Sequence, residues 1–356
     1  MRTEKVALLL AASLAAAAPM ALAQTVSPAA ELNGSLPANL IFRPKPGAAG
    51  KQPDFSATAA PRRTWGGREM PKEPASLAFL DNGAFNSEVR AWDYSTALEN
   101  SVFGSNPEET LRRLKGYKFL LIPGLGHRNP YFDETLAALK TVDAGAEIVD
   151  VAPFGSIAEN SRTVAEAIKR RGGKIILIGH SKGGLDLLQA LQGDASLSKS
   201  VEMIALLQTP YWGSPLGDST LSLAIRDILA YFGVKKMVGS THELLGSISD
   251  SSRANLPSLP PSLTGKIYSV ATALDPKDRR RADPRFLVLP RESDGAVPLV
   301  HAIVPCTRYG VFKNMGHMDT VRAEPKGLAP AGPGAFTLGV LRWMLDNRRP
   351  VAGACS

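Results

Sequence analysis

Gly179-His180-Ser181-Lys182-Gly183, directly after the apolar run Lys174-Ile175-Ile176-Leu177-Ile178, is the stretch that decides the fold of this chain. It fits the pattern Gly-x-Ser-x-Gly, in which a strand reverses sharply into a helix and leaves the serine at the tip of a strained turn. The two outer glycines remove side chains that would collide as strand and helix close together. The apolar residues before the motif, and the helical spacing of the leucines after it, favour this interpretation over a glycine-rich turn with an incidental serine. We therefore predict that Ser181 lies above a sheet edge, at a helix N-terminus that favours negative charge.

Strand-like and helix-like segments alternate along most of the chain from residue 117 onward. The apolar spacing predicts strands over 117–122, 146–151, 174–178, 201–207 and 267–273 and helices over 131–141, 157–171 and 333–347. Such alternation is typical of an α/β fold with a mostly parallel sheet that helices cover on both faces.

One long insertion interrupts the alternation, at about residues 211–264. It contains an amphipathic piece, Leu221 to Phe232, and a Ser/Pro-rich stretch, Ser247 to Thr264. A segment of this length over the carboxyl ends of the strands favours a helical lid above the site. A surface excursion without function is the alternative.

The N-terminal 23 residues have the pattern of a cleavable signal peptide. Arg2 and Lys5 precede an apolar run, Val6 to Ala18, that is too short to span a bilayer well, and small residues follow at Ala21-Leu22-Ala23. We expect cleavage between Ala23 and Gln24, hence a secreted or periplasmic protein without a transmembrane segment after cleavage. Residues 24–75, rich in Pro, Gly and Ala, are interpreted as a linker or extension, and 76–350 as the α/β domain that contains the elbow.

Export makes the cysteine count informative, because an oxidising compartment permits disulfides. Cys306 and Cys355 are the only cysteines in the sequence, so they form the only possible intramolecular pair. A bond between them would close a loop of about 50 residues and stabilise the fold by about 4 kcal/mol. Two unpaired thiols are the alternative.

The charge pattern gives no sign of a nucleic-acid partner. The formal net charge of the 356 residues is +8, and the basic residues are scattered apart from Asp278-Arg279-Arg280-Arg281. Aromatic residues do not alternate with them, so the charge is interpreted as a property of the surface.

A nucleophilic serine needs a base, and the base needs an acid to orient it. His317, which follows Gly316 on a loop after the strand-like Tyr309 to Phe312, is the predicted base. Asp294, before Gly295 in a turn, is the predicted acid, and the order Ser, acid, His is the one that this kind of elbow uses. The alternative acids are Asp275 and Glu292. The other histidines are His127 in a glycine-rich turn, His180 inside the elbow, His242 in the insertion and His301 on a packed element.

The developing negative charge on a substrate oxygen requires two N–H donors. We expect one from the backbone of Lys182 and the other from Leu125, in the turn Pro123-Gly124-Leu125-Gly126. The Lys182 side chain would either add positive potential near that oxygen or, as we favour, extend to solvent along the helix edge. A metal site is not expected, because histidines do not pair at helical spacing and the cysteines are far apart. A glycine-rich cofactor loop is not expected either, because the glycines belong to the elbow and to the turn at 123–126.

Four motifs together resemble the secreted bacterial triacylglycerol lipase and esterase branch of the α/β-hydrolase superfamily. They are the turn at 123–126, the elbow at 179–184, Ser293-Asp294-Gly295 and Gly316-His317, and Gln208 to Pro215 is similar to a Thr-Pro-x-x-Gly-Ser stretch of those enzymes. The resemblance covers about residues 117–346. It implies hydrolysis of carboxylic esters through an acyl-serine intermediate, with a small-molecule, lipid or polyester substrate. Those lipases usually carry Gln or Met at the position of Lys182.

The sequence therefore predicts a secreted serine ester hydrolase with Ser181, Asp294 and His317 as its triad. A polyester depolymerase, a thioesterase or an amidase would use the same machinery. A secreted binding protein on a hydrolase scaffold is the alternative from another functional class.

Overall fold

The computed structural model describes the backbone of residues 62–65, 68–71 and 75–78, and the chain from 88 to 348 with gaps. The gaps are 105, 128–129, 216–247, 249–258, 275–292, 314 and 323–331. All described residues belong to one compact unit, Leu36–Ser356. Several predictions therefore lie outside the described residues: the signal peptide 1–23, most of the extension 24–75, nearly all of the insertion, His242, Asp275, Glu292 and Cys355.

The central sheet contains seven parallel strands in the order β4-β10-β9-β8-β7-β5-β6, and β3 pairs antiparallel with β4 at one edge. The strands are β3 (Ala75–Ala78), β4 (Glu88–Asp93), β5 (Lys118–Ile122), β6 (Glu147–Ile148), β7 (Ile175–His180), β8 (Val201–Leu207), β9 (Ile267–Ala273) and β10 (Arg308–Lys313). A separate two-stranded antiparallel sheet contains β1 (Arg62–Trp65) and β2 (Arg68–Pro71).

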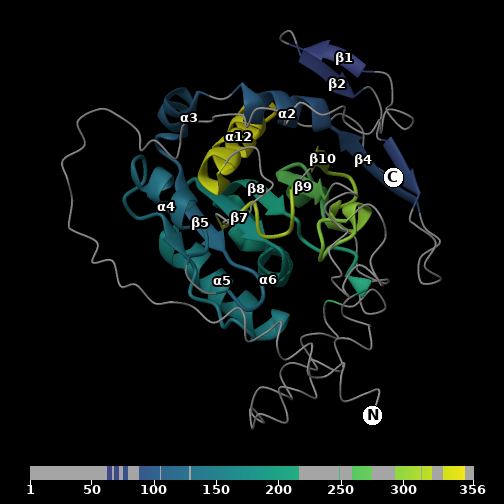
Figure 1. Cartoon of the computed structure of the whole chain (residues 1–356). Coiled ribbons are helices and arrows are strands. Elements are labelled where there is room, and N and C mark those ends of the chain that lie inside the picture. Colours follow the sequence, from purple (N-terminus) through teal and green to yellow (C-terminus); the bar gives the residue numbers. More distant parts are fainter. Residues whose placement is uncertain are drawn as a thin grey trace, which may run out of the picture. The chain divides into compact units, whose positions relative to one another are not determined.

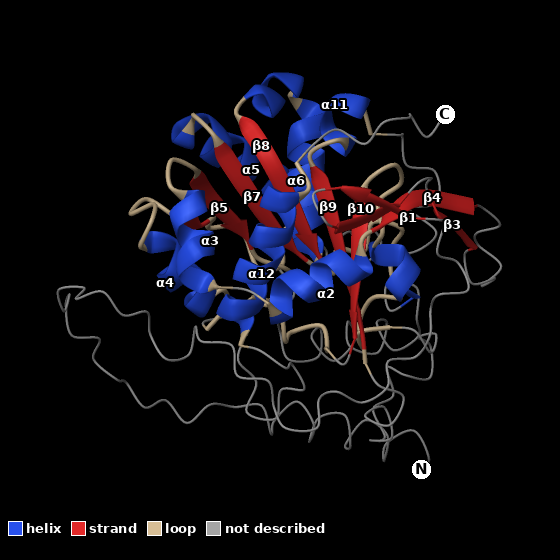
Figure 2. Ribbon diagram, turned by 90° about the horizontal axis from the view of Figure 1, so that it is seen from above, coloured by secondary structure: helices blue, strands red, loops and turns tan. Residues whose placement is uncertain are grey.

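Helices lie on both faces of the large sheet, as Figures 1 and 2 show. One face carries α2 (Ser95–Phe103), α3 (Pro107–Leu114), α4 (Asp133–Lys140) and α12 (Pro333–Asp346), and the other carries α5 (Ile157–Arg171) and α6 (Lys182–Gly193). Short helices also occur at Ala195–Lys199, Pro261–Thr264 and Leu299–Ala302. The predicted α/β class with a two-sided parallel sheet is confirmed.

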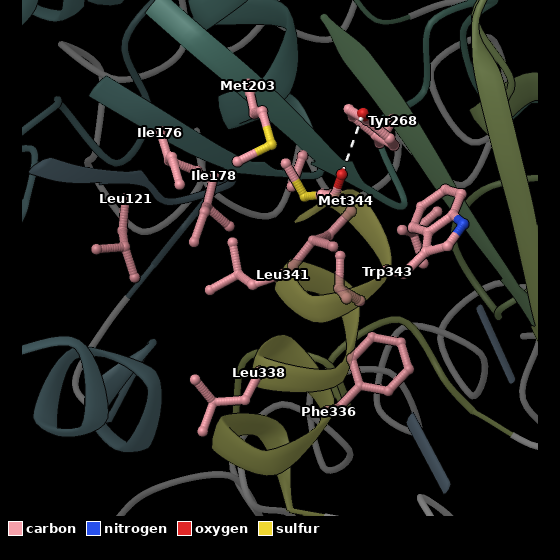
Figure 3. Packing of buried hydrophobic residues seen from close by; sticks show 14 of the residues in the cluster. Leu121, Ile176, Ile178, Met203, Tyr268, Phe336, Leu338, Leu341, Trp343 and Met344 are labelled. Carbon is pink, nitrogen blue, oxygen red and sulfur yellow. Dashed lines mark hydrogen bonds between the residues drawn. The ribbon is translucent and has the colours of Figure 1, made fainter. Parts of the chain in front are cut away.

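Alternation along the strands divides the interior into two apolar layers. In β5, Phe119 and Leu121 join the layer under α12, whereas Leu120 and Ile122 join the layer under α5 and α6. Figure 3 shows the first layer, in which α12 packs its apolar face against β5, β7, β8 and β9. The hydroxyl of Tyr268 donates to the Met344 carbonyl at 3.3 Å and so joins β9 to that helix.

For the buried elements, the boundaries predicted from sequence agree closely with those in the structure. The structure has α5, β8 and β9 at the predicted residues, while β6 is reduced to Glu147–Ile148. The elements β3, β4, α2 and α3 were not predicted individually, and β1 and β2 lie within 24–75, where the sequence indicated no regular element. Within the described part of the chain, no helix is long and apolar enough to cross a membrane.

Candidate active site

Ser181 connects β7 to α6 and has strained backbone geometry. Its dihedral angles are φ 53° and ψ −131°, in a region that residues with a side chain rarely occupy. A Cβ on Gly179 would lie 2.7 Å from the Gly184 Cα, and one on Gly183 would collide with two carbonyl oxygens at the end of β5. The glycines therefore permit the close approach that the elbow motif predicts.

A continuous hydrogen-bonded chain joins Ser181 to Asp294 through His317. The His317 Nε2 lies 2.9 Å from the Ser181 Oγ, and the His317 Nδ1 lies 2.8 Å from the Asp294 Oδ2. In the tautomer that satisfies both contacts, Nδ1–H donates to the carboxylate and Nε2 accepts from the hydroxyl. Ser181 lies 136 residues before His317 in the sequence, and Asp294 lies 23 residues before it. The fold therefore brings together the three residues predicted from sequence.

The Asp294 carboxylate is fixed on both sides. Its Oδ1 accepts hydrogen bonds from the backbone N–H groups of Ala296, at 2.8 Å, and Val297, at 2.7 Å. Gly295 between them has φ 94°, a conformation that glycine adopts without steric cost. Because the carboxylate is only 2% exposed and its other oxygen faces His317, it can stabilise positive charge on that imidazole.

The turn after β5 packs directly against the elbow. A Cβ on Gly124 would lie 2.9 Å from the Ser181 Cβ. The Gly124 N–H donates to the Tyr131 hydroxyl at 2.9 Å, and the Gly126 N–H donates to the Pro153 carbonyl at 2.8 Å. These two bonds fix the backbone on either side of Leu125. Lys182 is the first residue of α6, so its N–H is among those that no carbonyl of the same helix can accept.

Comparison with solved structures finds proteins of similar fold. The metagenomic carboxyl esterase MGS0156 is similar with a TM-score of 0.53 at 20% sequence identity, over 65% of this chain and 76% of that chain. The mature form of Bacillus licheniformis lipase BlEst2 gives a TM-score of 0.41 at 21% identity, over 56% of this chain and 84% of that chain. This chain has the α/β-hydrolase fold. No protein-family model and no curated protein sequence matches it.

In this α/β-hydrolase fold, a hydrogen-bonded chain behind the elbow joins the turn at Gly124 to the loop of His317. The Tyr131 hydroxyl lies 2.5 Å from the His180 Nδ1, and the His180 Nε2 lies 2.8 Å from the His317 carbonyl. The carbonyl can only accept, so Nε2 carries the proton and Nδ1 accepts from the tyrosine. Complete burial lowers the pKa of His180 well below its usual range, and the neighbouring His317 adds to this effect. His180 is therefore a neutral support of the site, a role that the sequence analysis did not assign to it.

Gln208 forms a second support of the same loop. This residue directly follows β8, is fully buried and has φ 50°. Its amide nitrogen donates to the Gly316 carbonyl at 3.0 Å and to the Thr272 hydroxyl, and its amide oxygen accepts from the Thr320 hydroxyl at 2.7 Å. The Gln208 amide thus fixes the backbone of Gly316, the residue before His317.

The favoured prediction for the Lys182 side chain is wrong. It does not extend to solvent: it is 2% exposed and donates to both carboxylate oxygens of Asp186, at 2.7 and 2.9 Å. The four-residue spacing places both groups on the same face of α6. Burial lowers the pKa of the Lys182 ammonium and raises the pKa of the Asp186 carboxyl to about 6, and the opposite charge counteracts each shift.

The other histidines within the described residues contact backbone carbonyls. The His127 Nδ1 lies 3.1 Å from the Gly124 carbonyl, and the His301 Nδ1 lies 3.2 Å from the Gly213 carbonyl. Cys306 precedes β10 and is partly buried. Because Cys355 lies outside the described residues, the predicted bond between the two cysteines stays a prediction. In the part of the chain that the structure describes, no three His, Cys, Asp or Glu side chains converge as metal ligands.

Proposed function

We propose that this protein is a serine hydrolase that cleaves carboxylic esters through an acyl-serine intermediate. The observation that carries the proposal is the hydrogen-bonded chain from the Ser181 Oγ through His317 to the buried Asp294 carboxylate. The strained serine and the fixed turn beside it support the same function, because acyl transfer needs both a raised nucleophile and preorganised donors.

In the proposed acylation step, the Ser181 Oγ attacks the ester carbonyl carbon while its proton passes to the His317 Nε2. The N–H groups of Leu125 and Lys182 hold the oxyanion of the tetrahedral intermediate. His317 then returns the proton to the departing alkoxide, and the acyl group remains on Ser181. Asp294 stabilises the imidazolium that exists between these two proton transfers.

Deacylation reverses the roles of the same groups. A water molecule loses a proton to His317 and attacks the acyl carbonyl, and the collapse of the second tetrahedral intermediate transfers that proton to the Ser181 Oγ. The products are a carboxylic acid and an alcohol. No step requires a metal or an organic cofactor.

Esters are the proposed substrate class because the carboxyl esterase MGS0156 has a similar fold. A thioester, an amide or a polyester would react by the same steps, so substrates rather than residues distinguish these activities. The N-terminal pattern of residues 1–23 supports export as part of the proposal, and intact mass spectrometry of the secreted protein would test whether it begins at Gln24, with or without cyclisation of that residue to pyroglutamate.

Hydrolysis of p-nitrophenyl esters with two to sixteen acyl carbons tests the proposal. We expect turnover by the wild-type protein, with the preferred chain length separating an esterase from a lipase. The Ser181→Ala variant is the control and should hydrolyse every ester at the background rate. A folded wild-type protein that hydrolyses no ester, thioester or amide would instead support a binding protein on a hydrolase scaffold.

A further inference from the structure

The buried pair of Lys182 and Asp186 has no part in the proton transfers proposed above. The two side chains are 2% and 1% exposed and lie on the first two turns of α6. Removing two charges from water is so costly that a well-packed apolar pair often stabilises a fold equally well. The ion pair therefore calls for an explanation other than stability.

Asp186 extends the contact from α6 to α5. Its Oδ2 accepts from the Asn160 amide nitrogen at 3.1 Å. The same amide also forms two bonds with the backbone of Ala152: its nitrogen donates to the carbonyl at 3.1 Å, and its oxygen accepts from the N–H at 3.1 Å. Asn160 is 2% exposed, and each polar atom of its side chain has a partner. It consequently fixes the loop that follows β6 relative to α6.

That loop in turn supports the turn after β5. The carbonyl of Pro153, the next residue after Ala152, accepts from the Gly126 N–H at 2.8 Å. The ring of Phe154 lies against Gly126, 3.6 Å from where a Cβ would be. The contacts that begin at the Lys182 side chain thus end one residue from Leu125. Lys182 and Leu125 are the two residues whose N–H groups we propose as oxyanion donors.

We propose that Lys182, Asp186 and Asn160 are positioning residues that set the separation of the two oxyanion donors. The proposal rests on the proposed function, because an oxyanion must form for the separation to matter. In this account, the lysine at the position after the nucleophile has two uses. Its backbone N–H contacts the substrate oxygen, and its side chain ties that donor, through α5, to the turn that contains the other.

The test replaces the pair as a unit, with Lys182→Met and Asp186→Leu in one protein, so that no buried charge is left alone. We expect kcat for p-nitrophenyl butyrate to fall about 10- to 100-fold, less than the loss caused by removing a donor, with KM changed less than about threefold. An aryl trifluoromethyl ketone, which forms an anionic hemiketal with the serine, should lose affinity by a similar factor. Asn160→Leu removes the contact between Asp186 and the loop that follows β6. This variant should likewise have a lower kcat with little change in KM.

The matched control removes a different ion pair, one that has its arginine at the end of α5. Arg171 forms an ion pair with Asp143, whose other oxygen accepts from the Phe119 N–H at 3.0 Å, at the amino end of β5. In Arg171→Met with Asp143→Leu, we expect unchanged kcat even where the melting temperature falls. The proposal is overturned if the Lys182 and Asp186 double variant keeps wild-type kcat, or if both double variants lose kcat in proportion to their loss of stability. Failure of the proposed function would be seen separately, as a wild-type protein without esterase activity.

Discussion

The Tyr131 hydroxyl should support both the oxyanion turn and the neutral state of His180. In Tyr131→Phe, the Gly124 N–H loses its acceptor and the His180 Nδ1 loses its donor, and both groups stay buried. Each unpaired buried group costs about 1–3 kcal/mol, so we expect the two groups to cost about 2–6 kcal/mol and to lower the melting temperature by about 3–10 °C. Because the turn at Gly124 carries a proposed oxyanion donor, kcat should also fall about 10- to 100-fold.

Tyr268→Phe is the matched control for this prediction. The Tyr268 hydroxyl is also buried and donates to the Asn347 carbonyl at 2.9 Å, beside α12. We expect this variant to lose stability while kcat for p-nitrophenyl butyrate stays within about twofold of wild type. Differential scanning calorimetry and initial-rate kinetics measure the two quantities. A Tyr131→Phe protein with wild-type kcat and melting temperature would refute the reasoning.

Three further predictions concern the elbow, the buried histidine and the acid. Gly183→Ala should abolish esterase activity because its Cβ would meet backbone carbonyls, whereas Gly193→Ala, with open space around it, should keep activity and unfold at the same or higher urea concentration. The folded-state pKa of His180 lies well below its unfolded value near 6.5, so below that pH the unfolded chain binds a proton that the folded protein does not. The free energy of unfolding is therefore unaffected by His180 above pH 6.5 and decreases as pH falls below it. Urea unfolding at pH 5.5 should show a loss on the order of 1 kcal/mol, which His180→Gln should lack; an identical pH dependence in that variant would count against a neutral His180. Asp294→Asn should lower kcat about 10⁴-fold with the fold intact by circular dichroism, and a comparable loss in Asp275→Asn instead would reassign the acid.

The central strands were predictable because parallel strands buried on both faces contain nearly continuous apolar residues. The strand β8, for example, is buried at every position except Glu202. The strand β4, which lies between β3 and β10, contains charged residues among its apolar ones and pairs with β10 at two residues, so its sequence carries a weaker signal. The start of α3 could have been found: Asn106 caps the helix by accepting from the Glu109 N–H, and Pro107 follows it.

In the site, the sequence indicated the residues that we propose to act and missed the residues that support them. The serine, acid and histidine each lie in a short motif whose local turn identifies them. The support contacts join residues far apart in sequence: Tyr131 and His180 are 49 residues apart, and Gln208 and Gly316 are 108 residues apart. Without the fold, such pairs have no signature.

The Lys182 and Asp186 pair is different, because its four-residue spacing was visible in the sequence. A charged pair at this spacing usually lies on an exposed helix face, where it contributes little to stability. The apolar residues that surround the pair in α6 are the signal that it is buried instead.

Covalent labelling with a fluorophosphonate tests the central claim most directly, because this reagent phosphonylates a serine that a neighbouring base activates. We expect one adduct per molecule by intact mass spectrometry, on the peptide that contains Ser181, and none in Ser181→Ala. His317→Ala should label at least 100-fold more slowly, since the Nε2 that accepts the serine proton is removed. Undiminished labelling of Ser181→Ala, or an adduct on another residue of the wild-type protein, would contradict the assignment of Ser181 as the nucleophile.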